Sequence, residues 1–228
     1  MYCASGTLDA SVQISPAIPR HGQTVWTQGY LGVQRCNFAI AGIQSSKYLA
    51  DEEKVDMLCE AKTLRGFFYL TLTNFFGDCP FYFDDVTDNA VLKRIARLPR
   101  MDASATRDSV INDLKKIAPL AAQTRTSDNK GARLGAACAY MVIAKCAMWN
   151  KEWTVALDAL KELENIYGDF SQYDLEENVM FRNKNTPESI MELQHIYVQG
   201  GLQYTSNLAC ICTPSRKKVG GVVLFDGV

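Results

Sequence analysis

Metal-ligand residues are few in this sequence and do not cluster. It has two histidines, His21 and His195, and none of its eight cysteines forms the CxxC pair typical of zinc sites. Cys59, Cys138 and Cys146 fall within helical apolar patterns, where a thiol usually behaves as a small buried hydrophobic group. The sequence therefore predicts no metal site and no cofactor. It also predicts unpaired, structural cysteines, a surface loop position for His21 and a strand position for His195.

An excess of charge of one sign is also absent. The chain has 24 Lys and Arg against 25 Asp and Glu, which gives a net charge of −1. Proteins that bind nucleic acid or anionic membranes usually carry a marked basic excess, so both kinds of partner are disfavoured. The sequence also lacks the GxSxG, HExxH, P-loop and Gly-rich dinucleotide signatures. These absences argue against the enzyme classes that such motifs define.

Targeting and membrane-spanning patterns are missing as well. The opening residues, MYCASGTLDA, lack the basic and apolar regions of a signal peptide, and we do not expect Cys3 to be a lipidation site. The longest apolar stretch, residues 134–149, contains Lys145 and is shorter than the roughly 20 residues that a membrane span needs. The sequence therefore predicts a buried helix in that stretch.

The strongest positive pattern is a long apolar helix that ends at a sharp stop. Its apolar side chains recur at three and four residues and predict one buried face: Leu58, Ala61, Leu64, Phe68, Leu72 and Phe75. Glu60, Lys62, Thr63 and Asn74 lie off this stripe and are expected to be solvent-exposed. Gly77 suits the left-handed position after a helix C-terminus, and Pro80 cannot extend a helix. We therefore expect a core helix around which the chain is organised.

Further helices are predicted at residues 26–43, 106–120, 134–149 and 153–167 from the same periodicity. The helix at 134–149 is apolar on two faces, which predicts that it is sandwiched between neighbours. Together with the helix at 153–167 it resembles a tetratricopeptide repeat. The predicted fold is mainly α, with helical hairpins resembling tetratricopeptide repeats, irregular loops and a few short strands. Residues 1–199 are expected to form an incomplete helical domain, and residues 200–228 an unassigned tail.

Several motifs resemble those of the SusD/RagB family. The family signature EA-x-x-LRA-x-x-Y…FGDVP is matched by Glu60-Ala61, Leu64-Arg65-Gly66, Phe68-Tyr69 and Phe76-Gly77-Asp78-Cys79-Pro80. Two residues depart from it: Gly66 replaces an alanine and Cys79 replaces a valine. The segment Glu188–Gln194 is also similar to the family's E-x-I-F-E-I-Q and is expected to be a short strand. The resemblance covers about residues 24–198.

The resemblance implies a function in nutrient capture. Members of this family are lipoproteins at the outer surface of Bacteroidetes, and they are partners of TonB-dependent outer-membrane transporters. The chain is therefore expected to bind an oligosaccharide or another oligomeric nutrient and to deliver it to a SusC-like transporter, without catalysing a reaction. Because family members are longer, we expect truncation at both ends, with the lipid anchor that supplies membrane contact absent from this chain. The alternatives are a tetratricopeptide-like scaffold for protein partners and, more weakly, a carbohydrate-active enzyme.

Aromatic residues are the candidate ligand contacts. Carbohydrate sites combine an exposed aromatic ring with nearby amide or carboxylate groups. Loop or helix-edge positions select Trp26, Tyr82, Phe83 and Tyr204 as predicted contacts, with Phe81 beside them. In contrast, Phe68, Phe75 and Trp153 lie on predicted core stripes and are excluded.

Charged residues are interpreted structurally. Asp84, Asp85 and Asp88 share one polar loop, where acids are usually solvated, so we assign them no role in glycoside hydrolysis. Glu60 and Arg65 lie on the same predicted helix and are expected to be mutual structural partners.

Overall fold

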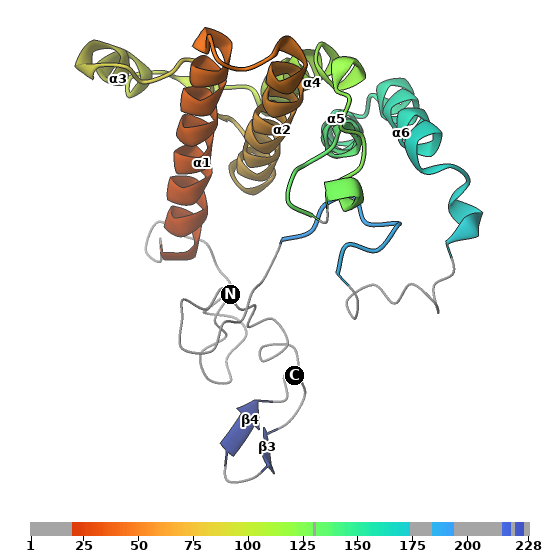
Figure 1. Cartoon of the computed structure of the whole chain (residues 1–228). Coiled ribbons are helices and arrows are strands. Elements are labelled where there is room, and N and C mark those ends of the chain that lie inside the picture. Colours follow the sequence, from red (N-terminus) through yellow and green to blue (C-terminus); the bar gives the residue numbers. More distant parts are fainter. Residues whose placement is uncertain (1–19, 130, 174–183, 194–215, 220–221, 226–228) are drawn as a thin grey trace. The chain divides into compact units, whose positions relative to one another are not determined.

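The computed structural model describes residues 20–129, 131–173, 184–193, 216–219 and 222–225 (Figure 1). The chain divides into two compact units, residues 1–191 and residues 192–228. The α-helices of the described residues all lie in the first unit: α1 (Arg20–Ser45), α2 (Asp51–Phe76), α3 (Asn89–Ile95), α4 (Ala103–Lys115), α5 (Ala136–Trp149) and α6 (Trp153–Tyr167). Three short 3-10 helices are η1 (Ala118–Leu120), η2 (Ser127–Asn129) and η3 (Phe170–Gln172). The prediction of a mainly helical protein is confirmed.

Helices α1 and α2 form the first hairpin and approach each other closely at two glycines of α1. A Cβ atom added to Gly32 would lie 2.4 Å from the Phe68 ring, and one added to Gly29 would lie 2.9 Å from Leu72. Phe68 and Leu72 therefore occupy space that the side chain of any larger residue at Gly32 or Gly29 would fill. Both side chains therefore face the helix that was predicted at residues 26–43.

Helix α2 is buried on more than the single face that the sequence predicted. On its other side, a Cβ atom added to Gly66 would meet Val110 of α4 at 2.8 Å and Val142 of α5 at 3.2 Å. Thr63, expected to be exposed, is 1% exposed, whereas Phe75, expected in the core, is 54% exposed. The prediction was also wrong for Glu60 and Lys62, whose side chains are only 20% and 15% exposed. One buried stripe was too few because α2 packs against α1 on one side and against α4 and α5 on the other.

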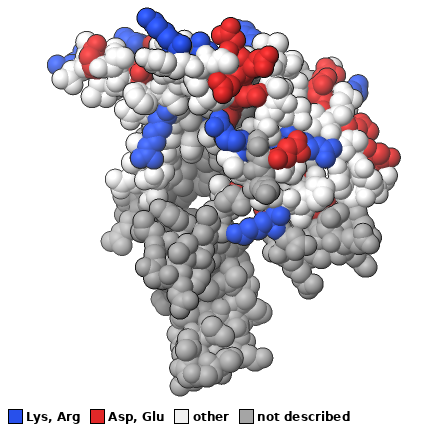
Figure 2. Space-filling view, viewed as in Figure 1, with Lys and Arg blue, Asp and Glu red and all other residues white. Residues whose placement is uncertain are grey.

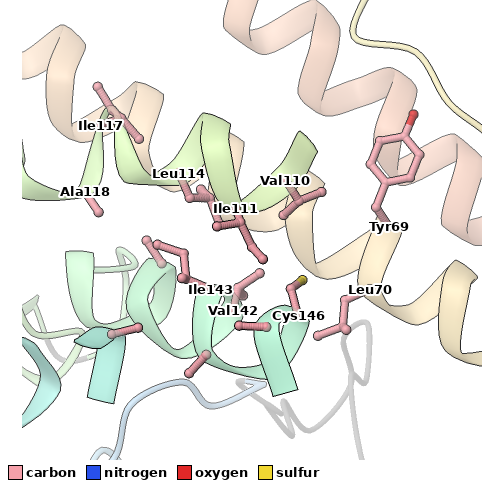
Figure 3. Close-up of a cluster of buried hydrophobic side chains, with 14 of the residues drawn as sticks. Tyr69, Leu70, Val110, Ile111, Leu114, Ile117, Ala118, Val142, Ile143 and Cys146 are labelled. Carbon is pink, nitrogen blue, oxygen red and sulfur yellow. The ribbon is translucent and has the colours of Figure 1, made fainter. Parts of the chain in front are cut away.

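The main core lies between α2, α4 and α5 (Figure 3). Leu114 of α4 and Ile143 and Cys146 of α5 are essentially inaccessible to solvent. Helix α5 begins after Gly135, where an added Cβ atom would be only 2.1 Å from the Thr124 carbonyl oxygen. The two-faced burial predicted for this helix is confirmed, since α6 covers the side that α2 and α4 leave open.

Helix α6 packs on α5 with small and large apolar side chains: Ala156, Ala159, Leu163 and Tyr167 are buried. Its first residue, Trp153, is 63% exposed, so the prediction that this ring lies in the core was wrong. Leu157 and Leu160 are also exposed, which leaves an apolar stripe on the outer side of α6. The helix ends at Gly168, whose φ of 76° few other residues adopt.

The strands of the described residues form two small antiparallel sheets. In the first unit β1 (Cys79–Pro80) pairs with β2 (Arg100–Met101). In the second unit β3 (Arg216–Val219) pairs with β4 (Val222–Phe225), with Arg216 opposite Phe225.

The strand predicted at residues 188–194 is not formed in its described part, residues 188–193. Main-chain carbonyl groups of this segment accept hydrogen bonds from side chains and not from a neighbouring strand. The Tyr167 hydroxyl donates to the Ser189 carbonyl oxygen, and the Thr126 hydroxyl donates to the Ile190 carbonyl oxygen. Gln194 and His195 lie outside the described residues.

On the face shown in Figure 2, Lys and Arg side chains alternate with Asp and Glu side chains, and no continuous basic area is seen on the described residues. Among the helices of the described part, none has the length and apolar character needed to cross a membrane.

Candidate ligand-binding site

An irregular segment, residues 80–84, runs from β1 across α1 and α2, and we call it the anchored segment. The Tyr30 hydroxyl of α1 donates to the Pro80 carbonyl oxygen at 2.7 Å. The Tyr69 hydroxyl of α2 donates to the Tyr82 carbonyl oxygen at 2.7 Å and accepts from the Tyr82 N–H at 3.0 Å. Tyrosines of both helices therefore hold the main chain of a segment that makes no helix.

A third anchor holds the end of this segment. The Asn37 side-chain amide of α1 donates to the Asp84 carbonyl oxygen at 3.0 Å. The anchored main-chain groups thus belong to residues 80, 82 and 84. Phe81 and Phe83 alternate with these residues in the sequence, and both rings contact Tyr69 of α2. Their ring centroids are 4.7 Å apart.

Burial keeps both anchoring tyrosines protonated. It raises the pKa of the Tyr30 hydroxyl and that of the Tyr69 hydroxyl far above the ordinary value for tyrosine. Neighbouring Cys79 acts in the same direction on the pKa of Tyr30. Both hydroxyls therefore remain hydrogen-bond donors at every pH at which the protein is expected to work.

A buried cation lies beneath the anchored segment. Arg65 of α2 is 3% exposed, and its guanidinium group lies 3.5 Å from the centroid of the Phe83 ring. It donates to the Asn37 side-chain oxygen at 2.7 Å and to Asp113 of α4 at 2.6 Å. Lys62 bonds the other oxygen of Asp113 at 2.7 Å, so that carboxylate is shared by two cations.

The predicted pairing of Glu60 with Arg65 is wrong, although both residues have structural partners. Glu60 instead pairs with Arg133 and accepts from the Leu134 N–H at 3.2 Å. Glu60 and Arg65 are five residues apart, a spacing that does not place two side chains on the same side of a helix. Each therefore reaches a different neighbouring element.

The aromatic cluster around the anchored segment consists of two groups of ring contacts: Trp26, Tyr30, Phe76 and Tyr82 in one, and Tyr69, Phe81 and Phe83 in the other. Trp26 and Tyr30 come from α1, Tyr69 and Phe76 from α2, and the rest from the anchored segment. Tyr69 is fully buried, with centroid distances of 4.8 Å to Phe81 and 6.3 Å to Phe83, and its hydroxyl joins the two groups through the main chain of Tyr82. The cluster thus joins three chain segments at one place.

Three of the four predicted contact residues belong to this cluster. Trp26 is half-buried between Tyr30 and Phe76, at centroid distances of 4.9 and 5.1 Å, and Phe83 is half-buried over Arg65. Tyr82 is only 9% exposed and lies parallel to Tyr30 at 6.2 Å. Tyr204 lies outside the described residues.

Sequence reasoning missed the residues that place this cluster. Tyr30 and Asn37 fall within the helix predicted at residues 26–43 but were not singled out, and Tyr69 was named only as a motif residue. A polar residue within an apolar stripe was the available signal, because a buried polar group requires a partner. Asn37 is 2% exposed.

Two of the three loop carboxylates, Asp84 and Asp88, have separate structural roles. Asp84 forms an exposed ion pair with Arg94 at 3.1 Å. Asp88 caps α3 by accepting from the backbone N–H groups of Ala90 and Val91, and these bonds lower the pKa of its carboxyl group. Within the described part of the chain, no group of three or more His, Cys, Asp or Glu side chains could hold a metal ion.

Thiol chemistry is suppressed by burial in the same region. The five described cysteines, Cys36, Cys59, Cys79, Cys138 and Cys146, are free and buried. Burial raises the pKa of Cys36 and of Cys59 to about 11 and that of Cys146 to about 12. Since the thiolate is the reactive form, these groups behave as small apolar side chains at neutral pH, as predicted.

A shallow depression of about 210 Å³ lies beside the first half of α2 and contains none of the predicted contacts. Five of its seven lining residues are polar or charged: Glu53, Asp56, Met57, Glu60, Gln123, Arg133 and Leu134 line it. Three of these polar side chains already have partners within the depression. Glu60 pairs with Arg133, and Asp56 accepts from the Gln123 N–H at 3.1 Å. The aromatic cluster remains the candidate site.

Stacked helical hairpins that hold an aromatic segment define a helical-repeat scaffold. A SusD-like family model, described as "Starch-binding associating with outer membrane", matches residues 17–148. This match covers more than half of the chain, and the chain belongs to that family. As predicted, the family is one of carbohydrate-binding proteins and not of enzymes.

A relative and two solved structures illustrate the likeness. A SusD-like protein, P25, of Formosa agariphila is 26% identical over 138 residues, which are 60% of this chain and 25% of that protein. Surface glycan-binding protein A from Bacteroides fluxus matches 84% of this chain with a TM-score of 0.67 and 19% identity. Its counterpart from Bacteroides thetaiotaomicron, solved in complex with laminarihexaose, matches 87% with a TM-score of 0.65 and 19% identity.

These structures share the fold of the present chain but are much longer. The chain covers 41% of the Bacteroides fluxus protein and 44% of the Bacteroides thetaiotaomicron protein. It therefore spans less than half the length of each of these relatives.

Proposed function

We propose that the protein captures a glucan oligosaccharide at the cell surface and delivers it to a TonB-dependent outer-membrane transporter. The family match carries this proposal, because residues 17–148 include α1, α2 and the whole anchored segment. A relative of the same fold was solved with laminarihexaose, and another is described as laminarin-binding. Laminarin-type oligosaccharides are therefore the first ligands to test.

Aromatic stacking is the proposed mode of binding. Sugar rings present apolar C–H faces that pack on aromatic rings, while their hydroxyl groups need polar partners. Trp26 and Phe83 are half-buried members of the aromatic cluster, so each keeps part of its ring accessible. Arg100, with its guanidinium 5.4 Å from the Trp26 ring, and Asp85 are polar groups close to these rings in space or sequence. Tyr82 would support the stacking surface from below, and Tyr204 is a further proposed contact.

Delivery requires a location at the outer membrane and a transporter partner. The family description associates its members with the outer membrane. We place the protein on the outer surface, held by a lipid anchor supplied in the full-length protein, with a SusC-like transporter as its partner. Reading the flanking genes for a large outer-membrane β-barrel and a lipid-accepting cysteine tests both statements.

Calorimetry on the full-length protein tests ligand capture. Titration with laminarihexaose should give saturable heat and no released reducing ends. The affinity should change by less than roughly twofold between about 0.05 and about 0.5 M salt, since stacking leaves no ion pair to be screened. Maltohexaose, titrated in parallel, distinguishes the glucan linkage. Absence of binding to either hexasaccharide would contradict glucan capture, and hydrolysis would contradict a binding role.

The outer side of α6 favours a second candidate function. Trp153, Leu157 and Leu160 form an exposed apolar stripe there, and such stripes commonly mark protein contacts. A tetratricopeptide-like scaffold that binds only protein partners would use this surface and would not need the aromatic cluster. A Leu157→Lys/Leu160→Lys variant should leave oligosaccharide binding intact if glycan capture is the function.

A further inference from the structure

Arg65 connects more elements of the site than Tyr30, Tyr69 or Asn37 does. Its guanidinium contacts Asn37 of α1, Asp113 of α4 and the Phe83 ring of the anchored segment, while its own Cα belongs to α2. A cation that is 3% exposed must be paired, because a buried unpaired charge is strongly destabilising. Asp113 supplies the opposite charge, and the guanidinium makes its other contacts with Asn37 and the Phe83 ring.

The contact between Arg65 and Asn37 determines how the main chain of Asp84, at the end of the anchored segment, is held. The Asn37 carboxamide has one oxygen, which accepts only, and one NH₂ group, which donates only. Since the oxygen accepts from Arg65 at 2.7 Å, the NH₂ group is directed to the Asp84 carbonyl oxygen at 3.0 Å. Arg65 therefore fixes the orientation of an amide that in turn fixes the main chain at residue 84.

The second contact of Arg65 is with the ring of Phe83, in the anchored segment. The guanidinium carbon lies over the ring, 3.5 Å from its centroid, and so supports the ring by a cation–π contact. Phe81 and Tyr69 also contact this ring, at centroid distances of 4.7 and 6.3 Å, and Phe83 remains half-buried. One side chain thus sets the ring of residue 83 and, through Asn37, the backbone of residue 84.

We propose that Arg65 is a positioning residue for oligosaccharide binding: it holds the anchored segment so that the accessible part of Phe83 can stack on a sugar ring. This inference rests on the proposed function, and it adds a buried residue that does not itself touch the ligand. Arginine is required because its planar fork makes both hydrogen bonds while it stacks on the ring. Lysine keeps the charge but cannot make these contacts together.

The variant pair Arg65→Lys and Lys62→Met tests the proposal. Both residues bond Asp113, at 2.6 and 2.7 Å, but only Arg65 contacts Asn37 and Phe83. Arg65→Lys should weaken laminarihexaose binding about tenfold in calorimetry, whereas Lys62→Met should change the affinity less than roughly twofold. Equal losses of affinity in the two variants would overturn the proposal, because they would trace the effect to the shared carboxylate.

A double-mutant cycle separates positioning from general damage to the fold. If Arg65 acts through Phe83, then Arg65→Lys should cause no further loss of affinity in a Phe83→Leu background. A purely structural role would lower the affinity by the same factor in both backgrounds, and that additive result would overturn the proposal.

Hydrogen exchange measured by mass spectrometry gives a readout that does not depend on a ligand. Arg65→Lys should accelerate amide exchange in peptides that cover residues 81–86 while α5 stays protected, and Lys62→Met should not. Unchanged exchange in these peptides would overturn the proposal whether or not a sugar binds. Accelerated exchange in a protein whose wild type binds no glucan would instead refute the proposed function, and with it the ligand half of this inference.

Discussion

The two helical hairpins of the first unit are built for different tasks. In the α1/α2 hairpin, Tyr30, Asn37 and Tyr69 use their polar groups to hold the main chain of the anchored segment. In the α5/α6 hairpin, the contact is made by small and apolar side chains such as Ala156 and Leu163. The comparison indicates that the first hairpin positions the site, whereas the second mainly provides stability.

The largest expected effect on stability concerns the buried side of α6, the helix assigned to the stabilising hairpin. Leu163→Ala should lower the free energy of unfolding by about 2–5 kcal/mol, because Leu163 is 1% exposed and its loss leaves a cavity. Leu160→Ala on the same helix, where the side chain is 39% exposed, should cost far less. Chemical denaturation measures both. Similar losses would refute the assignment of inner and outer sides of α6.

The second prediction concerns the close approach of α1 and α2. Gly32→Ala should destabilise the protein by about 1–3 kcal/mol, since the added Cβ atom would meet the Phe68 ring at 2.4 Å. Gly42→Ala lies on the same helix with nothing within 4 Å of the added atom, so it should stabilise by up to about 1 kcal/mol. Thermal unfolding of the two variants should therefore shift in opposite directions. A Gly32→Ala protein as stable as wild type would contradict the close packing.

The third prediction removes a single anchor. Tyr69→Phe leaves both main-chain groups of Tyr82 without their partner, which should cost about 1–3 kcal/mol of stability. Its effect on laminarihexaose binding should exceed that of Leu163→Ala, because it loosens the anchored segment directly. Tyr48→Phe, at a position that is 98% exposed, is the control and should be neutral. Calorimetry of the folded variants measures both affinities. A greater loss of affinity in Leu163→Ala than in Tyr69→Phe would contradict the assignment of the site to the α1/α2 hairpin.

Helix positions were the part of the fold that local signals could predict, although α1 begins at Arg20 and not at residue 26, and α4 ends at Lys115 and not at residue 120. Apolar residues at three and four residues located α1, α2, α4, α5 and α6, and glycines marked two of the ends. Gly77 and Gly168 have φ values of 66° and 76°, where a side chain would be strained. These features depend on neighbours in sequence, so periodicity and turn chemistry were sufficient to find them.

Pairings between distant segments could not be predicted in the same way. Arg65 meets Asp113, which is 48 residues away, and Glu60 accepts from the backbone of residue 134, which is 74 residues away. The orientation of α2 between three helices likewise decided that Thr63 is buried and Phe75 is exposed. For the candidate site, aromatic type and an expected loop or helix-edge position selected Trp26 and Phe83. Trp26 lies inside α1 and not at its edge, and only the packing revealed that Tyr82 is buried.

The smallest expected effect on stability concerns the outer stripe of α6. A Leu157→Lys/Leu160→Lys variant should change the free energy of unfolding by less than about 1 kcal/mol, because both side chains are exposed. The same variant should bind less of a hydrophobic dye and self-associate less than wild type, since the apolar stripe is interrupted. Fluorescence and light scattering measure these changes. A wild-type protein that is already monodisperse and dye-silent would show that the stripe is not an exposed adhesive surface.

One matched pair of variants tests the central claim, that the α1/α2 hairpin presents the ligand-binding aromatic residues. Phe83→Ala removes a half-buried ring of the aromatic cluster, and Trp153→Ala removes a more exposed ring of the α5/α6 hairpin. Calorimetric titration with laminarihexaose should show at least about a tenfold loss of affinity for Phe83→Ala and less than about a twofold change for Trp153→Ala. The reverse order would contradict the account, because binding would then follow the exposed ring of the second hairpin and not the anchored segment.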